Sequence, residues 1–259
     1  MDKATRQEKL KNRYNLIDEL RGLTVISMIL YHASWDFVYM LGRNWPWYHS
    51  NGAYIWQQSI CWTFILLSGF CFSMGKKRLQ RSLLVFGGGL VITAVTMIFS
   101  YNTRIIFGVL TMIGSCMLIM IPLEKLLKKC NSVAGLVASV LLFIITRNIN
   151  SGYIGFWNIK WVDLPREMYA NYITTYLGFP HAGFFSTDYF SLFPWLFLYI
   201  VGYFIYRLCQ GKKIMDVLKP ARVKPLGFVG RHAIVFYLAH QLVLYAIVEL
   251  IAIIWVMQS

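Results

Sequence analysis

Apolar residues along this chain are concentrated in long segments, and short polar connectors separate them. Each segment is close to the roughly 20 residues that a helix needs to cross a bilayer. The pattern therefore predicts an all-α polytopic membrane protein with about seven transmembrane helices. The expected spans are residues 17–40, 53–75, 82–100, 104–123, 132–147, 189–206 and 228–256. No Pro- or Ser-rich linker separates them, so residues 1–259 are expected to form a single domain.

Composition and charge agree with a membrane location. Hydrophobic residues make up 58% of the chain and charged residues 14%, which is more apolar than an ordinary soluble domain. The net charge of +14 could indicate nucleic acid, but 18 of the 25 Lys and Arg lie on alternate connectors and only five on the others. Because cytoplasmic loops carry the excess of Lys and Arg, we expect a multi-pass protein of the cell membrane. Its N terminus would be inside and its C terminus outside, with no nucleic-acid partner.

The five cysteines include no C-x-x-C pair, so neither a disulfide framework nor a zinc site is predicted, and no metal is expected.

The N-terminal segment is basic and precedes an apolar run, as in a signal peptide. However, Asp18, Glu19 and Arg21 interrupt it, and no small-residue cleavage site follows. The first apolar segment is therefore expected to remain as an uncleaved span rather than to act as a signal peptide.

One outer connector, residues 148–188, is far longer than the usual connection of about 4 to 6 residues. Within it, Asp163 is placed as an N-cap and Gly178 as a stop, which predicts a short interfacial helix. In the third span, "GGG" at 87–89 predicts the close approach of a neighbouring helix.

A polar stripe runs along the first span. At about 100° per residue, Arg21 and His32 point nearly the same way, and Asp36 lies one turn beyond His32 on that face. Titratable side chains at membrane depth are costly unless they are paired or hydrated. His32 could be a base held by the Asp36 carboxylate, or a neutral histidine bonded to a neighbouring helix. Arg21 could instead extend to the cytoplasmic surface.

Two further histidines extend this set. His49 follows the first span in the connector "LGRNWPWYHSNG", where Trp47 and its neighbours either anchor the chain at the interface or hold His49 over the mouth of the bundle. His240 lies inside the last span, where it is either a substrate contact or a polar residue bonded between helices.

Several segments resemble known membrane acyltransferases. "LIDELRGLTVISMILYHASWDF" is similar to the first span of the O-antigen type, in which an Arg and a His are separated by ten residues, as Arg21 and His32 are. The closer resemblance is to bacterial relatives of heparan-α-glucosaminide N-acetyltransferase. It rests on "LRGLTVISMILYH", "WYHSNG" with "CWTFILLSGF", "RIIFGVLTMIG", "FPWLFLYIVGY" and "LGFVGRHAIVFYLAHQ", which together cover most of the chain.

The resemblance implies transfer of an acetyl or other acyl group from cytoplasmic acyl-CoA to an amine or hydroxyl of an acceptor outside, with a sugar or glycan as the expected acceptor. In heparan-α-glucosaminide N-acetyltransferase itself, which is a lysosomal enzyme, the acceptor is a glucosamine amine. The proposed catalytic residue of that enzyme is a histidine of the first luminal loop, and His49 is the best match to it. His32 follows the O-antigen pattern, so two histidines compete for one role. His49 would be the base or a transient acyl carrier, two mechanisms that the sequence does not separate.

The expected roles follow from this resemblance and from charge-assisted binding of phosphates. Catalysis is assigned to His49, His32 and Asp36. Binding of acetyl-CoA, the acyl donor, is assigned to Arg21, Arg231, Arg222 and Lys224. Acceptor binding is assigned to Arg104, Trp47 and His240. The expected partners are the bilayer, acyl-CoA and the acceptor, and a homodimer is compatible with the sequence. The rival function is a small transporter or sensor whose polar stripe conducts protons or binds a solute.

Overall fold

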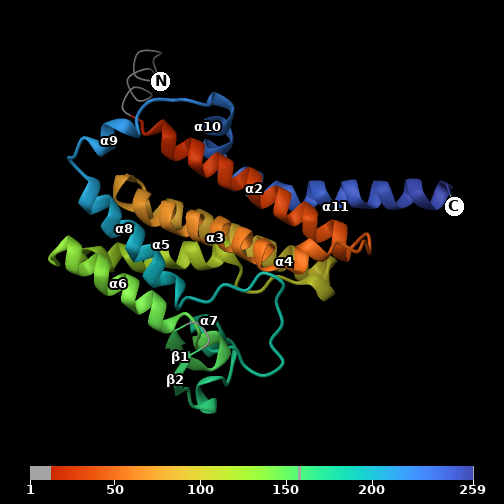
Figure 1. Cartoon of the computed structure of the whole chain (residues 1–259), viewed down its shortest axis with the longest axis horizontal. Helices are drawn as coiled ribbons and strands as arrows, with labels where there is room; N and C mark the ends of the chain where they lie inside the picture. The colour runs from red at the N-terminus through yellow and green to blue at the C-terminus, as the bar shows by residue number, and fades with distance from the viewer. Residues whose placement is uncertain (1–12, 157–158, 259) are drawn as a thin grey trace. The chain divides into compact units, whose positions relative to one another are not determined.

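A computed structural model describes residues 13–156 and 159–258 (Figure 1). The N-terminal arm, with four of the basic residues used in the topology argument, lies outside these ranges. The chain divides into two compact units, Met1–Phe64 with Cys209–Ser259, and Ile65–Leu208. We call them the first and second units. The expectation of a single domain stays a prediction.

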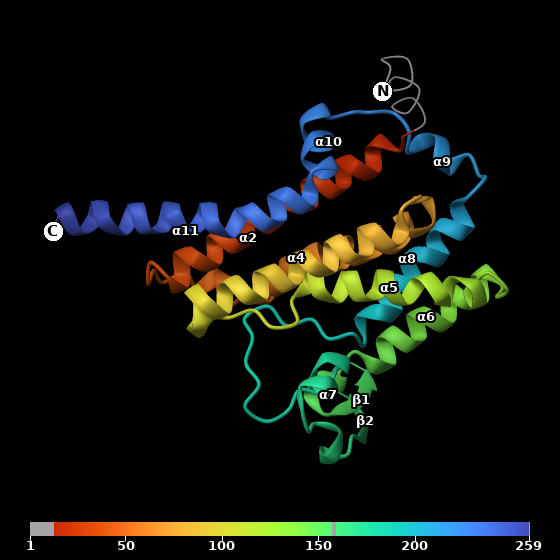
Figure 2. The ribbon, with the colours of Figure 1, turned by 180° about the vertical axis from the view of Figure 1, so that it is seen from behind.

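The first unit is built around the N-terminal long helix. Its elements are α2 (Asn15–Tyr39), η1 (Pro46–His49), the first part of α3 (Asn51–Cys71), α9 (Ile214–Val217), α10 (Lys224–Arg231) and α11 (Ala233–Gln258). The short helix α10 packs against the start of α2, and α11 continues along α2 (Figures 1 and 2). The chain thus brings its last two helices back onto its first.

Two glycines allow α2 and α10 to pack backbone to backbone. A Cβ at Gly22 would lie 2.0 Å from the carbonyl oxygen of Leu226, and a Cβ at Gly230 would lie 1.7 Å from that of Asp18. Both distances are far below van der Waals contact, and the opposing atoms belong to the backbone, which cannot rotate away. Small residues at these positions therefore determine how closely the two helices approach.

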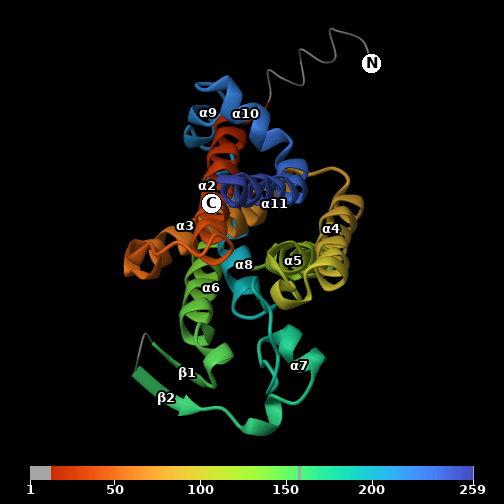
Figure 3. The same ribbon diagram turned by 90° about the vertical axis from the view of Figure 1, so that its right-hand side faces the viewer.

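The second unit contains the other long helices and the long connector. Its elements are the end of α3, η2 (Phe72–Met74), α4 (Arg78–Phe99), η3 (Tyr101–Thr103), α5 (Val109–Leu127), α6 (Ser132–Thr146), η4 (Ile149–Ser151), β1 (Tyr153–Phe156), β2 (Ile159–Asp163), η5 (Arg166–Met168), α7 (Tyr172–Leu177) and α8 (Trp195–Cys209). Helices α4 and α5 pack together, and the β-hairpin and α7 both lie within the connector that follows α6 (Figure 3).

In the part of the chain that the structure describes, five helices are long and apolar enough to cross a membrane: Asn51–Met74, Arg78–Phe99, Val109–Leu127, Ser132–Ser151 and Ala233–Ile251. Helix α8 is apolar but shorter. Helix α2 has 25 residues, but the polar side chains along it keep it outside this group. The mostly helical membrane class is confirmed, whereas the count of seven spans and the orientation of the termini stay predictions.

The last predicted span is interrupted. Residues 228–231 belong to α10, and His232 ends that helix before α11 begins at Ala233. The fourth and sixth spans also start later than predicted, at Val109 and Trp195, because the apolar residues before them form loops that pair with one another. In these loops the N–H of Phe190 donates to the carbonyl of Phe107 at 2.8 Å. Apolar composition alone does not separate a helix from such a loop.

The long connector corrects two expectations. Asp163 is not a helix N-cap, because it pairs with Tyr153 in an antiparallel hairpin that the sequence pattern missed. Every residue of β2 is exposed, so the strand has no alternation of buried and exposed positions from which to predict it. The helix in this region is confined to Tyr172–Leu177 and is capped by Asn171, whose side chain accepts from the third residue of the helix. Its predicted end at Gly178 is confirmed.

The contact between α4 and α5 gives a matched stability test. A Cβ at Gly89 would lie 2.5 Å from the backbone nitrogen of Thr111, whereas a Cβ at Gly87 would meet no atom within 4 Å. We expect Gly89→Ala to lower the free energy of unfolding by about 1–3 kcal/mol. Gly87→Ala should be neutral or stabilise by up to about 1 kcal/mol, because alanine is the better helix former. Thermal unfolding of both variants in detergent checks this, and equal melting temperatures would contradict the close approach.

Candidate functional site

The polar face of α2 meets a second histidine on α11. The rings of His32 and His240 have centroids 4.9 Å apart and are tilted by 54°. His240 is buried, with 8% of its surface exposed. Its Nδ1 lies 2.6 Å from the carbonyl oxygen of Tyr237, one turn earlier on the same helix. Its Nε2 is buried and has no hydrogen-bond partner among the described residues.

Asp36 lies on the same seam between α2 and α11. It is fully buried, and its Oδ1 accepts from the Gln241 amide at 3.4 Å, while its Oδ2 has no partner in the described part of the chain. The sequence interpretation paired this carboxylate with His32. The structure instead gives Asp36 a contact with Gln241, and gives His32 a contact with His240. Gln241 was missed by the sequence analysis, although it directly follows His240 in an otherwise apolar segment.

An aromatic cluster covers the C-terminal half of α2. Tyr31 lies against Tyr48 and Trp56, with ring centroids 5.5 and 5.3 Å away, and the Trp56 indole donates to Ser27 Oγ at 2.7 Å. Burial raises the pKa of Tyr48 above its ordinary value, and its hydrogen bond with Tyr31 raises it further. The Tyr48 hydroxyl therefore stays protonated at neutral pH and donates its hydrogen to Tyr31.

His49 lies at the edge of this cluster, next to Tyr48, and is exposed. Its ring packs edge-on to Tyr39, with centroids 6.1 Å apart. Tyr39 is seven residues past His32, which corresponds to about 10 Å along the axis of α2 and nearly the same helix face. The two histidines considered for the catalytic role thus lie at different positions along one side of α2. His32 lies beside the buried imidazole of His240, and His49 lies in the exposed connector.

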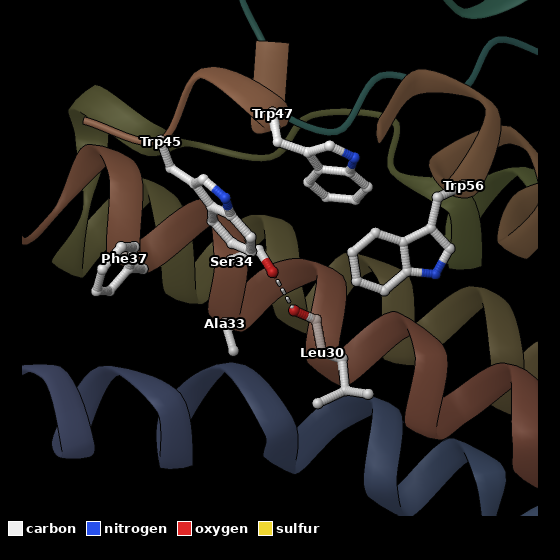
Figure 4. A pocket seen from close by; sticks show the side chains of 7 residues that line it. All are labelled: Leu30, Ala33, Ser34, Phe37, Trp45, Trp47 and Trp56. Carbon is white, nitrogen blue, oxygen red and sulfur yellow. Dashed lines mark hydrogen bonds between the residues drawn. The ribbon is translucent and has the colours of Figure 1, made fainter. Parts of the chain in front are cut away.

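Trp47 belongs to a separate surface. A shallow apolar groove of about 680 Å³ runs along α2. It is lined by Leu30, Ala33, Ser34, Phe37, Trp45, Trp47 and Trp56, and Figure 4 shows the three indoles gathered over the helix. At about 100° per residue, this face of α2 is roughly opposite the one that carries His32. The acceptor-binding role expected for Trp47 stays a prediction, and the structure does not bring Trp47 to the histidine pair.

The N-terminal end of α2 holds two buried acids among cations. Asp18 and Glu19 are each 4% exposed. Arg21 Nη1 lies 3.2 Å from Asp18 Oδ1, and Glu19 Oε1 accepts from the backbone N–H groups of Arg222 and Val223 at 2.7 and 2.9 Å. Glu19 thereby satisfies N–H groups at the start of α10, which have no partner within that helix.

The cations predicted to bind acyl-CoA gather at this junction. The side chains of Arg222, Lys224 and Arg231 are exposed on or beside α10, and α10 packs on the segment of α2 that carries Arg21. The Arg231 guanidinium lies beside Gly227 of the same helix, since its Nη1 would be 3.2 Å from a Cβ added at that glycine. All four predicted residues thus belong to the one helix contact that Asp18 and Glu19 stabilise.

Arg104 lies in the second unit. Its guanidinium stacks on Tyr101, 4.4 Å from the ring centroid, and on Phe185 at 5.2 Å. The side chain that was predicted to contact the acceptor is thus packed against two aromatic rings.

The second unit also has a polar pocket of about 630 Å³ that the sequence analysis missed. It is lined by Asn150, Ser151, Gly152, Asp163, Leu164, Arg166 and Tyr169. Over residues 13–156 and 159–258, no three His, Cys, Asp or Glu side chains are grouped as metal ligands.

Comparison with known proteins agrees with the resemblance seen in the sequence. The family model described as heparan-alpha-glucosaminide N-acetyltransferase, catalytic, matches residues 13–242, which is most of the chain. No curated protein and no solved structure matches. The matched range includes His32, His49, Asp36 and His240, together with the basic junction of α2 and α10. The chain is therefore a member of the heparan-α-glucosaminide N-acetyltransferase catalytic-domain family, a family of membrane acetyltransferases.

Proposed function

We propose that this protein transfers an acetyl or other acyl group from cytoplasmic acyl-CoA to an amine or hydroxyl of an acceptor on the far side of the membrane. The observation that carries the proposal is the arrangement along one face of α2. A cluster of cations lies at its N-terminal end, and the rings of His32 and the buried His240 lie about 16 Å further along the axis, eleven residues past Arg21. An extended pantetheine arm has a comparable length.

The cations supply the donor site in this proposal. Arg21, Arg222, Lys224 and Arg231 bind the phosphates of acyl-CoA through charge-assisted hydrogen bonds. The thioester then reaches His32. Because Arg21 is already paired with Asp18, the phosphates share or replace a contact that the free protein makes with its own carboxylate.

His32 acts as the general base. The acceptor nitrogen or oxygen attacks the thioester carbonyl, its proton passes to the imidazole, and the C–S bond breaks to release CoA as the thiolate. The thiolate then recovers that proton, which restores the neutral base. His49, in the open connector, contacts the arriving acceptor or carries the acyl group for the last part of its path. The acceptor is a sugar or glycan, in keeping with the family to which the chain belongs.

The donor site gives a binding prediction. Arg21→Ala should weaken the affinity for acetyl-CoA by about 10- to 100-fold, because it removes a hydrogen bond to a charged group worth about 1.5–3 kcal/mol. Isothermal titration calorimetry on the protein in detergent measures this. Arg43→Ala, on the connector predicted to lie outside, should leave the affinity unchanged. A similar loss in both variants would indicate nonspecific attraction of an anion to a basic protein.

Transfer itself is tested with labelled acetyl-CoA. The full chain in detergent is incubated with and without a panel of hexosamine and polyol acceptors, and both label transfer and CoA release are measured. We expect CoA release that depends on the acceptor. If the protein binds acetyl-CoA but transfers the acetyl group to no acceptor, the proposal is contradicted and the transporter or sensor is favoured. Transfer by His32→Ala at the wild-type rate would also contradict the proposal.

A further inference from the structure

The hydrogen bond of His240 fixes which of its nitrogens carries the proton. A backbone carbonyl only accepts, so the 2.6 Å contact between Nδ1 and the oxygen of Tyr237 requires the hydrogen on Nδ1. In the neutral ring, Nε2 then has the lone pair. This assignment follows from the geometry of the helix turn and does not depend on any ligand.

The lone pair of Nε2 is buried without a donor in the described part of the chain. Leaving a buried acceptor unsatisfied costs about 1–3 kcal/mol, so a donor is to be expected nearby. The imidazole of His32 is the ring whose centroid lies 4.9 Å away. The other polar groups on this seam are accounted for differently, since Asp36 Oδ1 accepts from Gln241 and both Asp36 oxygens are acceptors when ionised.

We propose that His240 is a positioning residue for His32: starting from the ring contact in the structure, a rotation of the His32 side chain lets Nε2 of His240, which has no partner among the described residues, accept the ring N–H of His32. The other nitrogen of His32 then has the lone pair that faces the acceptor. This inference rests on the proposed function in one respect, namely that His32 is the base. The chain of contacts is then the Tyr237 carbonyl, His240 and His32, running from α11 to α2. It gives His32 a neutral partner in the place where the sequence suggested a carboxylate.

A fixed tautomer matters for the reaction. His32 can take the proton of the attacking acceptor only through a nitrogen that has a free lone pair. With His240 as the acceptor for the other nitrogen, the lone pair is always on the side of the thioester. When His32 takes the proton, its second N–H remains bonded to His240, and the charge forms without a change in the contacts of the pair.

Two substitutions separate positioning from packing. His240→Gln keeps an acceptor oxygen at this position, whereas His240→Leu keeps the bulk and has no acceptor. We expect His240→Leu to lower kcat for acyl transfer by about 10- to 100-fold, which is typical for the loss of a residue that orients a functional histidine. His240→Gln should retain most of kcat, and KM for acetyl-CoA should stay within about twofold in both. An equal loss of kcat in the two variants would overturn the positioning role.

The tautomer itself is measured without activity. The chain has five histidines, so ¹⁵N-histidine labelling of the protein in detergent gives five rings, and single substitutions assign them. We expect the Nδ1–H form for His240, and one tautomer of His32 in the wild type and in His240→Gln. His240→Leu should give a mixture at His32. An unchanged His32 tautomer in His240→Leu, or Nε2–H at His240, would overturn the inference. If the spectra are as expected but the protein transfers no acyl group, only the proposed function is contradicted.

Discussion

His32→Ala is expected to lower kcat for acyl transfer about 10³-fold while the affinity for acetyl-CoA stays within about twofold. General-base catalysis by a positioned side chain contributes roughly 10²–10⁴-fold, and His32 is the proposed base. Arg21, one of the cations proposed to bind the phosphates, lies about 16 Å away along α2, so removal of the imidazole should not disturb that site. Single-turnover transfer assays and calorimetric titration with acetyl-CoA measure the two quantities separately.

The control for this prediction is another histidine of the same unit. His232 is exposed and packs on Phe228, with ring centroids 4.6 Å apart, and it has no role in the proposed chemistry. His232→Ala should therefore retain kcat. Loss of acetyl-CoA affinity in His32→Ala with kcat retained would reverse the roles given to the two ends of α2.

Gly230→Ala is expected to disrupt the contact of α10 with α2. The added Cβ would lie 1.7 Å from the carbonyl oxygen of Asp18 and 2.8 Å from the backbone nitrogen of Gly22. Because only backbone atoms oppose it, the helices must separate, and we expect a loss of about 3 kcal/mol in the free energy of unfolding, the upper end of the cost of overpacking. Affinity for acetyl-CoA should fall as well, since α10 carries Lys224 and Arg231. Differential scanning calorimetry and titration with acetyl-CoA check both.

Gly227→Ala, in the same helix, is the matched control. Its Cβ would meet only side-chain atoms, Arg231 Nη1 at 3.2 Å and Glu19 Cγ at 3.6 Å. The flexible arginine can move aside, so this variant should be as stable as the wild type. If Gly230→Ala unfolds at the same temperature as Gly227→Ala, the two helices do not pack through their backbones.

The acidic residues at the start of α2 show how one local feature acquires a tertiary role. From the sequence, Asp18 and Glu19 interrupt a basic segment, and acids near a helix N terminus are favourable there in any case. In the structure, Glu19 accepts from the N–H groups of Arg222 and Val223, 203 and 204 residues further along the chain. A carboxylate just after the first turn of its own helix thus also serves a second helix.

The sequence by itself determined the long apolar helices and the side of α2 that carries its titratable side chains. Apolar segments of spanning length were predicted from local composition, and the common face of Arg21, His32 and Asp36 follows from the 3.6-residue period alone. The family resemblance was also readable, because its motifs are short segments of contiguous residues.

Only the tertiary structure decided the partners of those residues. His240 and Gln241 reach His32 and Asp36 from more than 200 positions away, and no local pattern says which helix will return to α2 or in what register. The hairpin was missed because both faces of β2 are exposed. The periodicity of a sequence indicates which face of one helix or strand is apolar and which is polar. Which elements pair depends on how they pack together. Here the packing of α10 on α2 depends on Gly22 and Gly230, which let the two backbones touch.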